Sequence, residues 1–302
     1  MPRMRVAFFG LPLAALLLHA DGHEIVHAGI CRAGALGTRR LRARLGAARV
    51  FVKPNLTTEA AQARVEACGP DLVVSWFWTT RIPMRIVRAA RYGGFGVHPS
   101  LLPRHRGPDP YFWAVDAGDH ETGVTAHRLA EEYDTGALLG HRALVIDPSW
   151  SAWRLAKRLD RPSLALMRET ANAFASGTPP AESPQDEALA TAAPEPDDAM
   201  LELRWTWSTA RVVRRVRAAS PWPGAFTVLG DEELVVTRVA PVSDFPRALA
   251  PGESAVVAGC AVVRTADGAV ALLEGRDEDG NALNKEAFCV RVAVMAKGEG
   301  VL

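Results

Sequence analysis

The stretch GFGVHPSLLPRHRGPDPYFWAV, residues 94–115, joins a short apolar strand to a loop rich in proline and arginine. His98 ends the expected strand, and the carboxyl ends of strands are where open α/β sheets bind their ligands. Pro99 fixes the backbone after it, and Ser100 is placed to cap the next segment. A lone histidine is more often structural than catalytic, but this position at a strand end favours a catalytic role for His98.

The residues around this stretch alternate short apolar runs with helical patterns. Such alternation is typical of a doubly wound α/β sheet. Gly10 stands alone after the first run, and without a GxGxxG motif dinucleotide binding has little support. The opening residues resemble a signal peptide. The alternative, a first strand and a helix, is favoured because an apolar strand follows them, as a βαβ unit requires. The expected strands are 6–9, 25–30, 50–52, 72–76, 94–98 and 122–128, and the expected helices 58–67, 83–90 and 153–174.

A change in composition marks the end of this α/β region. Residues 176–198, SGTPPAESPQDEALATAAPEPDD, are rich in proline, alanine and acids and lack a sustained apolar period, which is typical of a linker. A helix is expected at 209–219, followed by short apolar runs and turns such as FTVLGDEELVVTRVA. The sequence therefore predicts an α/β domain at 1–176, a linker at 177–203 and a smaller β-rich, barrel-like domain at 204–302.

Charge and cysteine content narrow the class of protein. The 302 residues carry a formal net charge of +1, so nothing global argues for a nucleic acid or a membrane as partner. The four cysteines lie far apart and form no CxxC pair, so neither a metal site nor a redox motif is expected. A reduced, cytoplasmic protein is the expectation. No apolar run after the first approaches the ~20 residues of a membrane span.

A second polar candidate is Asp134, in EEYDTGALLG at residues 131–140. An aspartate before Thr-Gly commonly forms an Asx turn. The functional alternative places its carboxylate near the end of strand 122–128, where it orients His98 and raises the basicity of the imidazole. Spacing alone leaves both interpretations open.

Several motifs, taken together and in order, resemble one family. VHPSLLPRHRG at 97–107, ETGVTAHRL at 121–129 and DTGALL at 134–139 follow the strand LVVSW, and PWPGAF at 221–226 and LNKEAF at 283–288 extend the match past the expected linker. They resemble the formyltransferases that use 10-formyltetrahydrofolate, among them the methionyl-tRNA and the aminosugar-nucleotide formyltransferases. The resemblance spans roughly the whole chain. It implies a Rossmann-like formyltransferase domain and an OB-like C-terminal domain.

The resemblance also implies a catalytic site. The family uses Asn, His and Asp. His98 and Asp134 match the last two, but the Asn position, two residues before the histidine, holds Gly96. In this scheme the histidine accepts the proton of the attacking amine, the aspartate orients the histidine, and the Asn donates an amide N–H to the developing oxyanion.

The folate cleft implied by the family lies between residues 73–83 and 133–139. Trp76 and Trp78 share a strand face if the period of two continues, and one ring of this region is expected to stack on the pterin, with core packing as the alternative. The expected folate contacts are Trp76, Phe77, Trp78, Ile82, Tyr133, Thr135, Gly136 and Leu138.

Gly96 leaves three hypotheses open. Formyl transfer continues with a donor from the backbone, from His105 or from a water; the site serves another one-carbon or acyl reaction; or the protein only binds folate or a partner. Because His98, Asp134 and the loop between them are retained, an active formyltransferase with an atypical catalytic triad is favoured. No other asparagine lies near the motif in sequence, since the chain has only Asn55, Asn172, Asn281 and Asn284.

The acceptor is predicted to be a small amine. Five arginines within 32–44 either contact phosphate or form a solvated helix face. Acidic residues at 232–233 and 277–279 disfavour tRNA binding by the C-terminal domain. An aminosugar nucleotide, an amino acid or a specialised-metabolite intermediate is therefore favoured over tRNA. Asp109 pairs either with a cationic acceptor or with Arg106. The expected substrate contacts are Ser100, Arg106, Asp109 and Tyr111.

Overall fold

The computed structural model describes residues 3–298, which form two compact units. The first unit contains the residues up to 110 together with 121–145 and 157–194. The second contains 111–120, 146–156 and the residues from 195 onward. Within the described part of the chain, no helix has the length and apolar character needed to cross a membrane.

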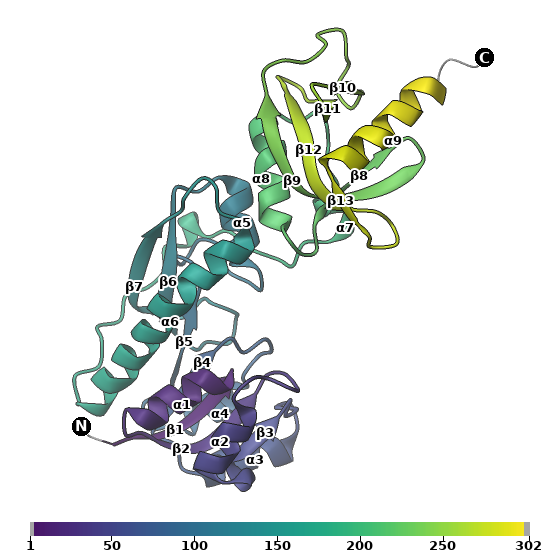
Figure 1. Cartoon of the computed structure of the whole chain (residues 1–302). Helices are drawn as coiled ribbons and strands as arrows, with labels where there is room; N and C mark the ends of the chain where they lie inside the picture. Colours follow the sequence, from purple (N-terminus) through teal and green to yellow (C-terminus); the bar gives the residue numbers. More distant parts are fainter. Residues whose placement is uncertain (1–2, 299–302) are drawn as a thin grey trace. The chain divides into compact units, whose positions relative to one another are not determined.

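A seven-stranded sheet of order β3-β2-β1-β4-β5-β6-β7 forms the centre of the first unit (Figure 1). The pairs among β1 to β5 are parallel, and β6 and β7 add antiparallel strands at one edge. This confirms the α/β class and the six expected strands, and adds β7, which the sequence did not predict. The strands are β1 Arg5–Gly10, β2 Glu24–Ile30, β3 Val50–Val52, β4 Leu72–Trp76, β5 Gly94–His98, β6 Glu121–Arg128 and β7 Leu138–Val145.

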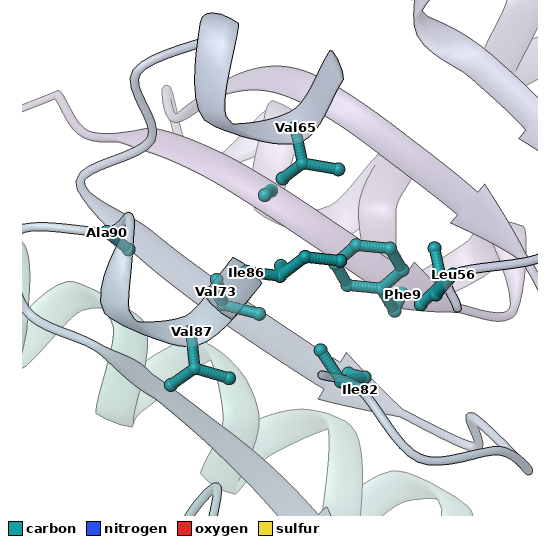
Figure 2. Close-up of a cluster of buried hydrophobic side chains, with 9 residues drawn as sticks. Phe9, Leu56, Val65, Val73, Ile82, Ile86, Val87 and Ala90 are labelled. Carbon is teal, nitrogen blue, oxygen red and sulfur yellow. The ribbon is translucent and has the colours of Figure 1, made fainter. Parts of the chain in front are cut away.

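Helices cover both faces of this sheet. On one face, Val65 of α3 and Ile86 of α4 pack against Phe9 of β1 in a buried apolar cluster (Figure 2). On the other face, Phe174 of α6 stacks on Phe95 of β5. The helices of the α/β region are α1 Pro12–Ala20, α2 Thr38–Leu45, α3 Glu59–Ala67, α4 Met84–Arg88 and α6 Ala152–Ala175, with short 3₁₀ turns at Ala47–Arg49 and Glu187–Leu189.

Strand alternation sets the orientation of the site. In β5, Gly94, Gly96 and His98 point to the face opposite Phe95 and Val97, because successive side chains alternate across a strand. The two glycines thus leave this face of β5 without side chains up to His98. This bare face is where the side chains of the neighbouring strand β6 have room to lie.

The segment 177–194 is held by the first unit and is not a free linker. Ser183 pairs with Leu138 of β7 through two backbone hydrogen bonds of 2.7 and 3.0 Å, and Ala192 bridges to Arg106. The division of the structure therefore falls between 194 and 195, whereas the composition predicts boundaries at 176 and 204. The physical reason is that backbone pairing holds this segment, and such pairing leaves no apolar period in the sequence.

The second unit is β-rich and contains an antiparallel sheet of order β10-β11-β12-β9-β8, with β13 paired to β12. This confirms the expected smaller β-rich domain. Helix α5 belongs to the same unit, and its Asp116 forms a buried bidentate pair of 2.7 and 2.9 Å with Arg215 of α8. The elements are α5 Pro110–Ala117, α7 Asp198–Leu201, α8 Thr209–Ala219, β8 Ala225–Leu229, β9 Glu232–Val242, β10 Ser254–Val257, β11 Cys260–Arg264, β12 Ala269–Arg276, β13 Ala282–Asn284 and α9 Lys285–Gly298.

Candidate active site

His98 ends β5, as predicted, and only 6% of its surface is exposed. Its Nε2 lies 2.8 Å from the carbonyl oxygen of His105. A carbonyl only accepts hydrogen bonds, so Nε2 carries a proton and donates it to this oxygen. The other ring nitrogen, Nδ1, lies 3.5 Å from Oδ2 of Asp134. The ring is thus held by one contact and faces a carboxylate with the other.

Asp134 lies between β6 and β7 with a φ of +58°, in the left-handed region that aspartate tolerates better than most residues. Its Oδ2 accepts a hydrogen bond of 3.0 Å from the backbone N–H of Gly107. The carboxylate therefore faces both His98 and the loop after β5. The geometry supports the functional interpretation of Asp134, since the side chain reaches across to another loop.

His127 of β6 is the third member of the site, and sequence reasoning missed it. Its Nδ1 donates to the carbonyl of Arg128 at 2.9 Å, and its Nε2 lies 3.5 Å from Oδ1 of Asp134. Burial lowers the pKa of His127, while the negative charge of Asp134 opposes this shift. His127 is marked out by the register of β5 against β6, which places it directly opposite Gly96. The sequence alone does not give this register.

Gly96 faces the imidazole of His127. A Cβ at position 96 would lie 3.3 Å from Nε2 of His127 and 3.5 Å from Cδ2 of Leu129. The first distance is tighter than nine in ten real Cβ contacts, so a side chain at position 96 requires the ring of His127 to shift by a few tenths of an ångström. The space beside position 96 is therefore occupied by His127.

The loop after His98 is shaped by polar side chains of its own and of strand β6. Thr125 Oγ1 donates to the carbonyl of Ser100 at 2.7 Å and accepts from the N–H of Leu102. Ser100 Oγ donates to the carbonyl of Arg104 at 2.6 Å and is fully buried. Ser100 therefore fixes the shape of the loop after His98.

Arg106 ties this loop to the segment 177–194. Its guanidinium donates to Oε1 of Gln185 and to both carboxylate oxygens of Glu187 at 2.7–3.1 Å. Glu187 raises the pKa of Arg106. Arg106 therefore has an ion-pair partner that the sequence did not predict. Asp109 is held by a backbone hydrogen bond to Ala193.

Gln185 joins the two loops of the site. Its Nε2 donates to the carbonyls of Asp134 and Gly136 at 2.7 and 2.8 Å, while its Oε1 accepts from Arg106. Sequence reasoning missed Gln185 because it lies inside the expected linker. A glutamine among proline and alanine carries no signal until the two loops that it contacts are known.

The expected folate contacts are distributed over both faces of the sheet. Trp76 is 3% exposed and donates its indole N–H to Ser163 of α6, whereas Trp78 packs on Phe9 on the opposite face. The expectation that Trp76 and Trp78 share a face is wrong. The strand ends at Trp76, and Phe77 has a φ of +57°, which breaks the alternation. Ile82 lies in the apolar cluster of Figure 2.

The remaining predicted contacts lie in and beside the Asp134 loop. Tyr133 is 53% exposed, and the guanidinium of Arg81 lies 5.7 Å from its ring centroid. Thr135 donates to the carbonyl of Glu132, and a Cβ at Gly136 would overlap the carbonyl oxygen of Arg128 at 2.0 Å. Leu138 begins β7. Tyr111, by contrast, belongs to helix α5 of the second unit.

Chemically, the site offers two imidazoles and one carboxylate. Such groups can accept a proton from an attacking amine and return one to a leaving nitrogen. Among residues 3–298, no group of three His, Cys, Asp or Glu side chains gathers to hold a metal ion.

Comparison with known proteins identifies the family. Residues 24–170 match the model described as formyl transferase, and residues 197–292 match the formyl transferase C-terminal domain. A methionyl-tRNA formyltransferase of Anaeromyxobacter dehalogenans is 32% identical over 288 residues, which cover 90% of this chain and 91% of the relative. The chain therefore belongs to the formyl transferase family, whose members transfer formyl groups. The resemblance in the sequence motifs is confirmed.

Solved structures share the fold. HypX from Aquifex aeolicus, in complex with tetrahydrofolic acid, has a TM-score of 0.63 at 23% identity, covering 98% of this chain and 48% of HypX. The chain thus spans about half the length of HypX. An N-formyltransferase from Helicobacter canadensis, in complex with folinic acid and dTDP-3-aminofucose, has a TM-score of 0.65 at 12% identity, covering 89% of this chain and 98% of that one.

Proposed function

We propose that the protein transfers the formyl group of 10-formyltetrahydrofolate to the primary amine of a small acceptor. The observation that carries this proposal is the carboxylate of Asp134 facing Nδ1 of His98 at the end of a parallel strand. Membership of the formyl transferase family supports the reaction. Folate compounds bound to two proteins of similar fold support the donor.

In the proposed reaction, the acceptor nitrogen attacks the formyl carbon and forms a C–N bond, and the carbonyl oxygen becomes negative. His98 takes the proton that the amine loses, and Asp134 holds the imidazole in place and stabilises its positive charge. The C–N10 bond then breaks, and N10 of the folate receives the proton from His98. The products are the formylated amine and tetrahydrofolate, so atoms and charge balance.

Folate binding is proposed along the Phe77–Trp78 and Tyr133–Leu138 segments. Phe77 and Trp78 are partly exposed, and Tyr133 is exposed, so their rings are available for stacking on a flat heterocycle. Trp76 and Ile82 are both buried, on opposite faces of the sheet, and are proposed to support Phe77 and Trp78 through packing. Asp109 and Tyr111 remain the proposed contacts of the acceptor. Ser100 and Arg106 are proposed to influence acceptor binding indirectly, by fixing the shape of the loop after His98.

A small acceptor is proposed because the acids of the second unit lie together. Glu232 and Asp277 both face Arg291, at 2.9 and 3.6 Å, and Glu278 accepts from the N–H of Glu233. This surface carries more negative than positive charge, which disfavours a phosphate backbone. Four free cysteines support a reducing, cytoplasmic environment.

Methionyl-tRNA is the second candidate acceptor. Four arginines of the short helix α2 are exposed, and the relative from Anaeromyxobacter dehalogenans formylates this class of substrate according to its name. Exposed arginines on one helix can follow a phosphate backbone, and binding would then weaken steeply with salt. The arginines are Arg39, Arg40, Arg42 and Arg44.

The test offers 10-formyltetrahydrofolate with a panel of small amines, including aminosugar nucleotides and amino acids, and separately with methionyl-tRNA. Release of tetrahydrofolate is followed for the wild type and for His98→Ala. Release that depends on a small amine and is lost in His98→Ala supports the proposal. Turnover only with methionyl-tRNA, falling as salt rises, supports the second candidate. Folate binding without turnover with any acceptor contradicts both.

A further inference from the structure

Positions 96 and 127 are paired across the sheet and compete for one space. They lie opposite each other in the antiparallel register of β5 and β6, and a Cβ at position 96 would lie 3.3 Å from Nε2 of His127. The motif resemblance implies an asparagine amide donor at position 96, where this chain has glycine. The imidazole of His127 borders the space that a side chain at position 96 would enter.

The hydrogen bonds of the two imidazoles define how many protons the site carries. Nε2 of His98 and Nδ1 of His127 each donate to a backbone carbonyl, at 2.8 and 2.9 Å. Both remaining nitrogens lie 3.5 Å from the carboxylate of Asp134. An ionised carboxylate only accepts hydrogen bonds, and so does an unprotonated ring nitrogen. With both imidazoles neutral and Asp134 ionised, three acceptors would face one another without a proton between them.

This arrangement is satisfied when the three groups share one additional proton. Held on Nε2 of His127 or Nδ1 of His98, the proton forms an ion pair with Asp134 in a buried site, where such contacts are strong. Burial, the neighbouring His98 and Arg106 from the loop after β5 disfavour positive charge on His127 and lower its pKa, whereas Asp134 and the hydrogen bond to Arg128 favour it. Leu129 contributes an apolar contact on the side of Gly96. Asp134 is the acidic group that faces both rings.

We propose that His127 replaces the missing asparagine as the catalytic donor, its Nε2–H stabilising the formyl oxygen as that oxygen becomes negative. This inference rests on the proposed formyl transfer and assigns a role within it. His98 remains the base that takes the amine proton, and His127 keeps its own proton throughout. When the tetrahedral intermediate collapses, the carbonyl re-forms, the C–N10 bond breaks and His98 protonates N10. Charge on the imidazolium makes this hydrogen bond stronger than one from a neutral amide.

The experiment exchanges the donor between the two positions. His127→Ala removes the proposed donor, so kcat is expected to fall about 10²–10³-fold, the loss typical of one oxyanion donor. Gly96→Asn alone is also expected to lower kcat, because its side chain meets the ring of His127. In the double variant, Gly96→Asn with His127→Ala, the amide has room, and kcat is expected to recover at least about tenfold over His127→Ala. A purely structural role for His127 does not produce such recovery.

The readouts separate this inference from the proposed function. Turnover is measured with the best acceptor amine and, independently of the acceptor, as formate released by water from 10-formyltetrahydrofolate. His27→Ala serves as a matched control, because His27 is a buried histidine of the same sheet that lies outside the site. Unfolding by urea and binding of 5-formyltetrahydrofolate are measured for every variant.

Two outcomes overturn the donor role alone and leave the proposed function in place. If His127→Ala keeps the wild-type kcat while His98→Ala loses it, the proposed function stands and the role of His127 falls. If the double variant is no more active than His127→Ala at equal stability, position 127 does not substitute for position 96. Wild-type protein without turnover in any assay overturns the proposed function, and this inference with it.

Discussion

Two of the buried histidines of the first unit, His127 and His27, lie in contrasting surroundings. His127 has a backbone carbonyl on one nitrogen and the Asp134 carboxylate near the other. His27 of β2 stacks on Phe51 with ring centroids 4.7 Å apart, and among the residues that the structure describes neither of its nitrogens has a hydrogen-bond partner. Burial lowers the pKa of His27 to about 4. Burial thus lowers the pKa of both imidazoles, and only at His127 does a facing carboxylate oppose that shift.

The strongest test of this contrast removes one histidine from each region. His98→Ala is expected to lower kcat/KM for formyl transfer about 10³-fold, within the range for a general base. His27→Ala is expected to keep the wild-type turnover and to lose stability, because only packing is removed. Steady-state kinetics and urea unfolding on both variants provide the check. A His98→Ala enzyme within tenfold of the wild type would show that the base lies elsewhere.

Neutralising the carboxylate should make the site resemble the surroundings of His27. Asp134→Asn keeps an oxygen that can accept from Gly107 but removes the negative charge, so kcat is expected to fall about 10²-fold or more. Asp71→Asn is the matched control, because Asp71 also accepts a backbone N–H, from Arg5, and lies outside the site. Its kcat should not change. Equal losses in the two variants would assign the effect to loop structure and not to charge.

The His27 region makes a prediction about stability and pH. The unfolded state protonates near pH 6.5, whereas the folded state resists protonation until about pH 4, so stability falls as the pH drops through this window. Between pH 7 and pH 5 the free energy of unfolding should decrease by about 2 kcal/mol from this group. Urea unfolding of the wild type and of His27→Phe at both pH values measures it. An unchanged slope with pH in His27→Phe would contradict the assignment.

The sequence carried more information about strands than about contacts between them. Apolar runs predicted β3, β4 and β5 to the residue. His98 and Asp134 were found from strand ends and from family motifs. His127 could not be found in this way, because its significance depends on the register of β5 against β6, which places it opposite a glycine. A single strand shows which side chains share a face but not which residue of the next strand they meet.

The segment 177–194 shows the same limit from the other direction. Its composition predicts a linker, yet the hydroxyl of Thr191 accepts from the backbone N–H of His105, and its carbonyl accepts from that of Arg106. Gly107 has a φ of +127° and lets the carbonyl of Ala193 approach closely. A Cβ at position 107 would lie only 2.7 Å from that carbonyl oxygen. These contacts use backbone groups and small residues, so they depend on the position of each residue and are compatible with a composition that resembles a disordered chain.

The smallest expected effect compares two glutamines that make the same kind of contact. Gln185 donates to the carbonyls of Asp134 and Gly136, and Gln62 of α3 donates to those of Leu56 and Thr57. Gln185→Ala and Gln62→Ala should each cost about 1–3 kcal/mol of stability, because carbonyls lose their donors. Only Gln185→Ala should also lower kcat, by about tenfold, since Asp134 is held in a left-handed conformation that its neighbours must maintain.

Steady-state kinetics, measured well below the melting temperatures of Gln185→Ala and Gln62→Ala, separates the loss of kcat from the loss of stability. If Gln185→Ala loses activity while Gln62→Ala, at equal stability, does not, segment 177–194 positions the catalytic carboxylate and belongs to the active site. If both variants keep the wild-type kcat, the backbone of the Asp134 loop and the bond from Gly107 suffice to hold the carboxylate. The polar contacts of Gln185 would then stabilise the fold without affecting catalysis. In that respect they would resemble the apolar cluster of Figure 2, which packs on strands β1 and β4.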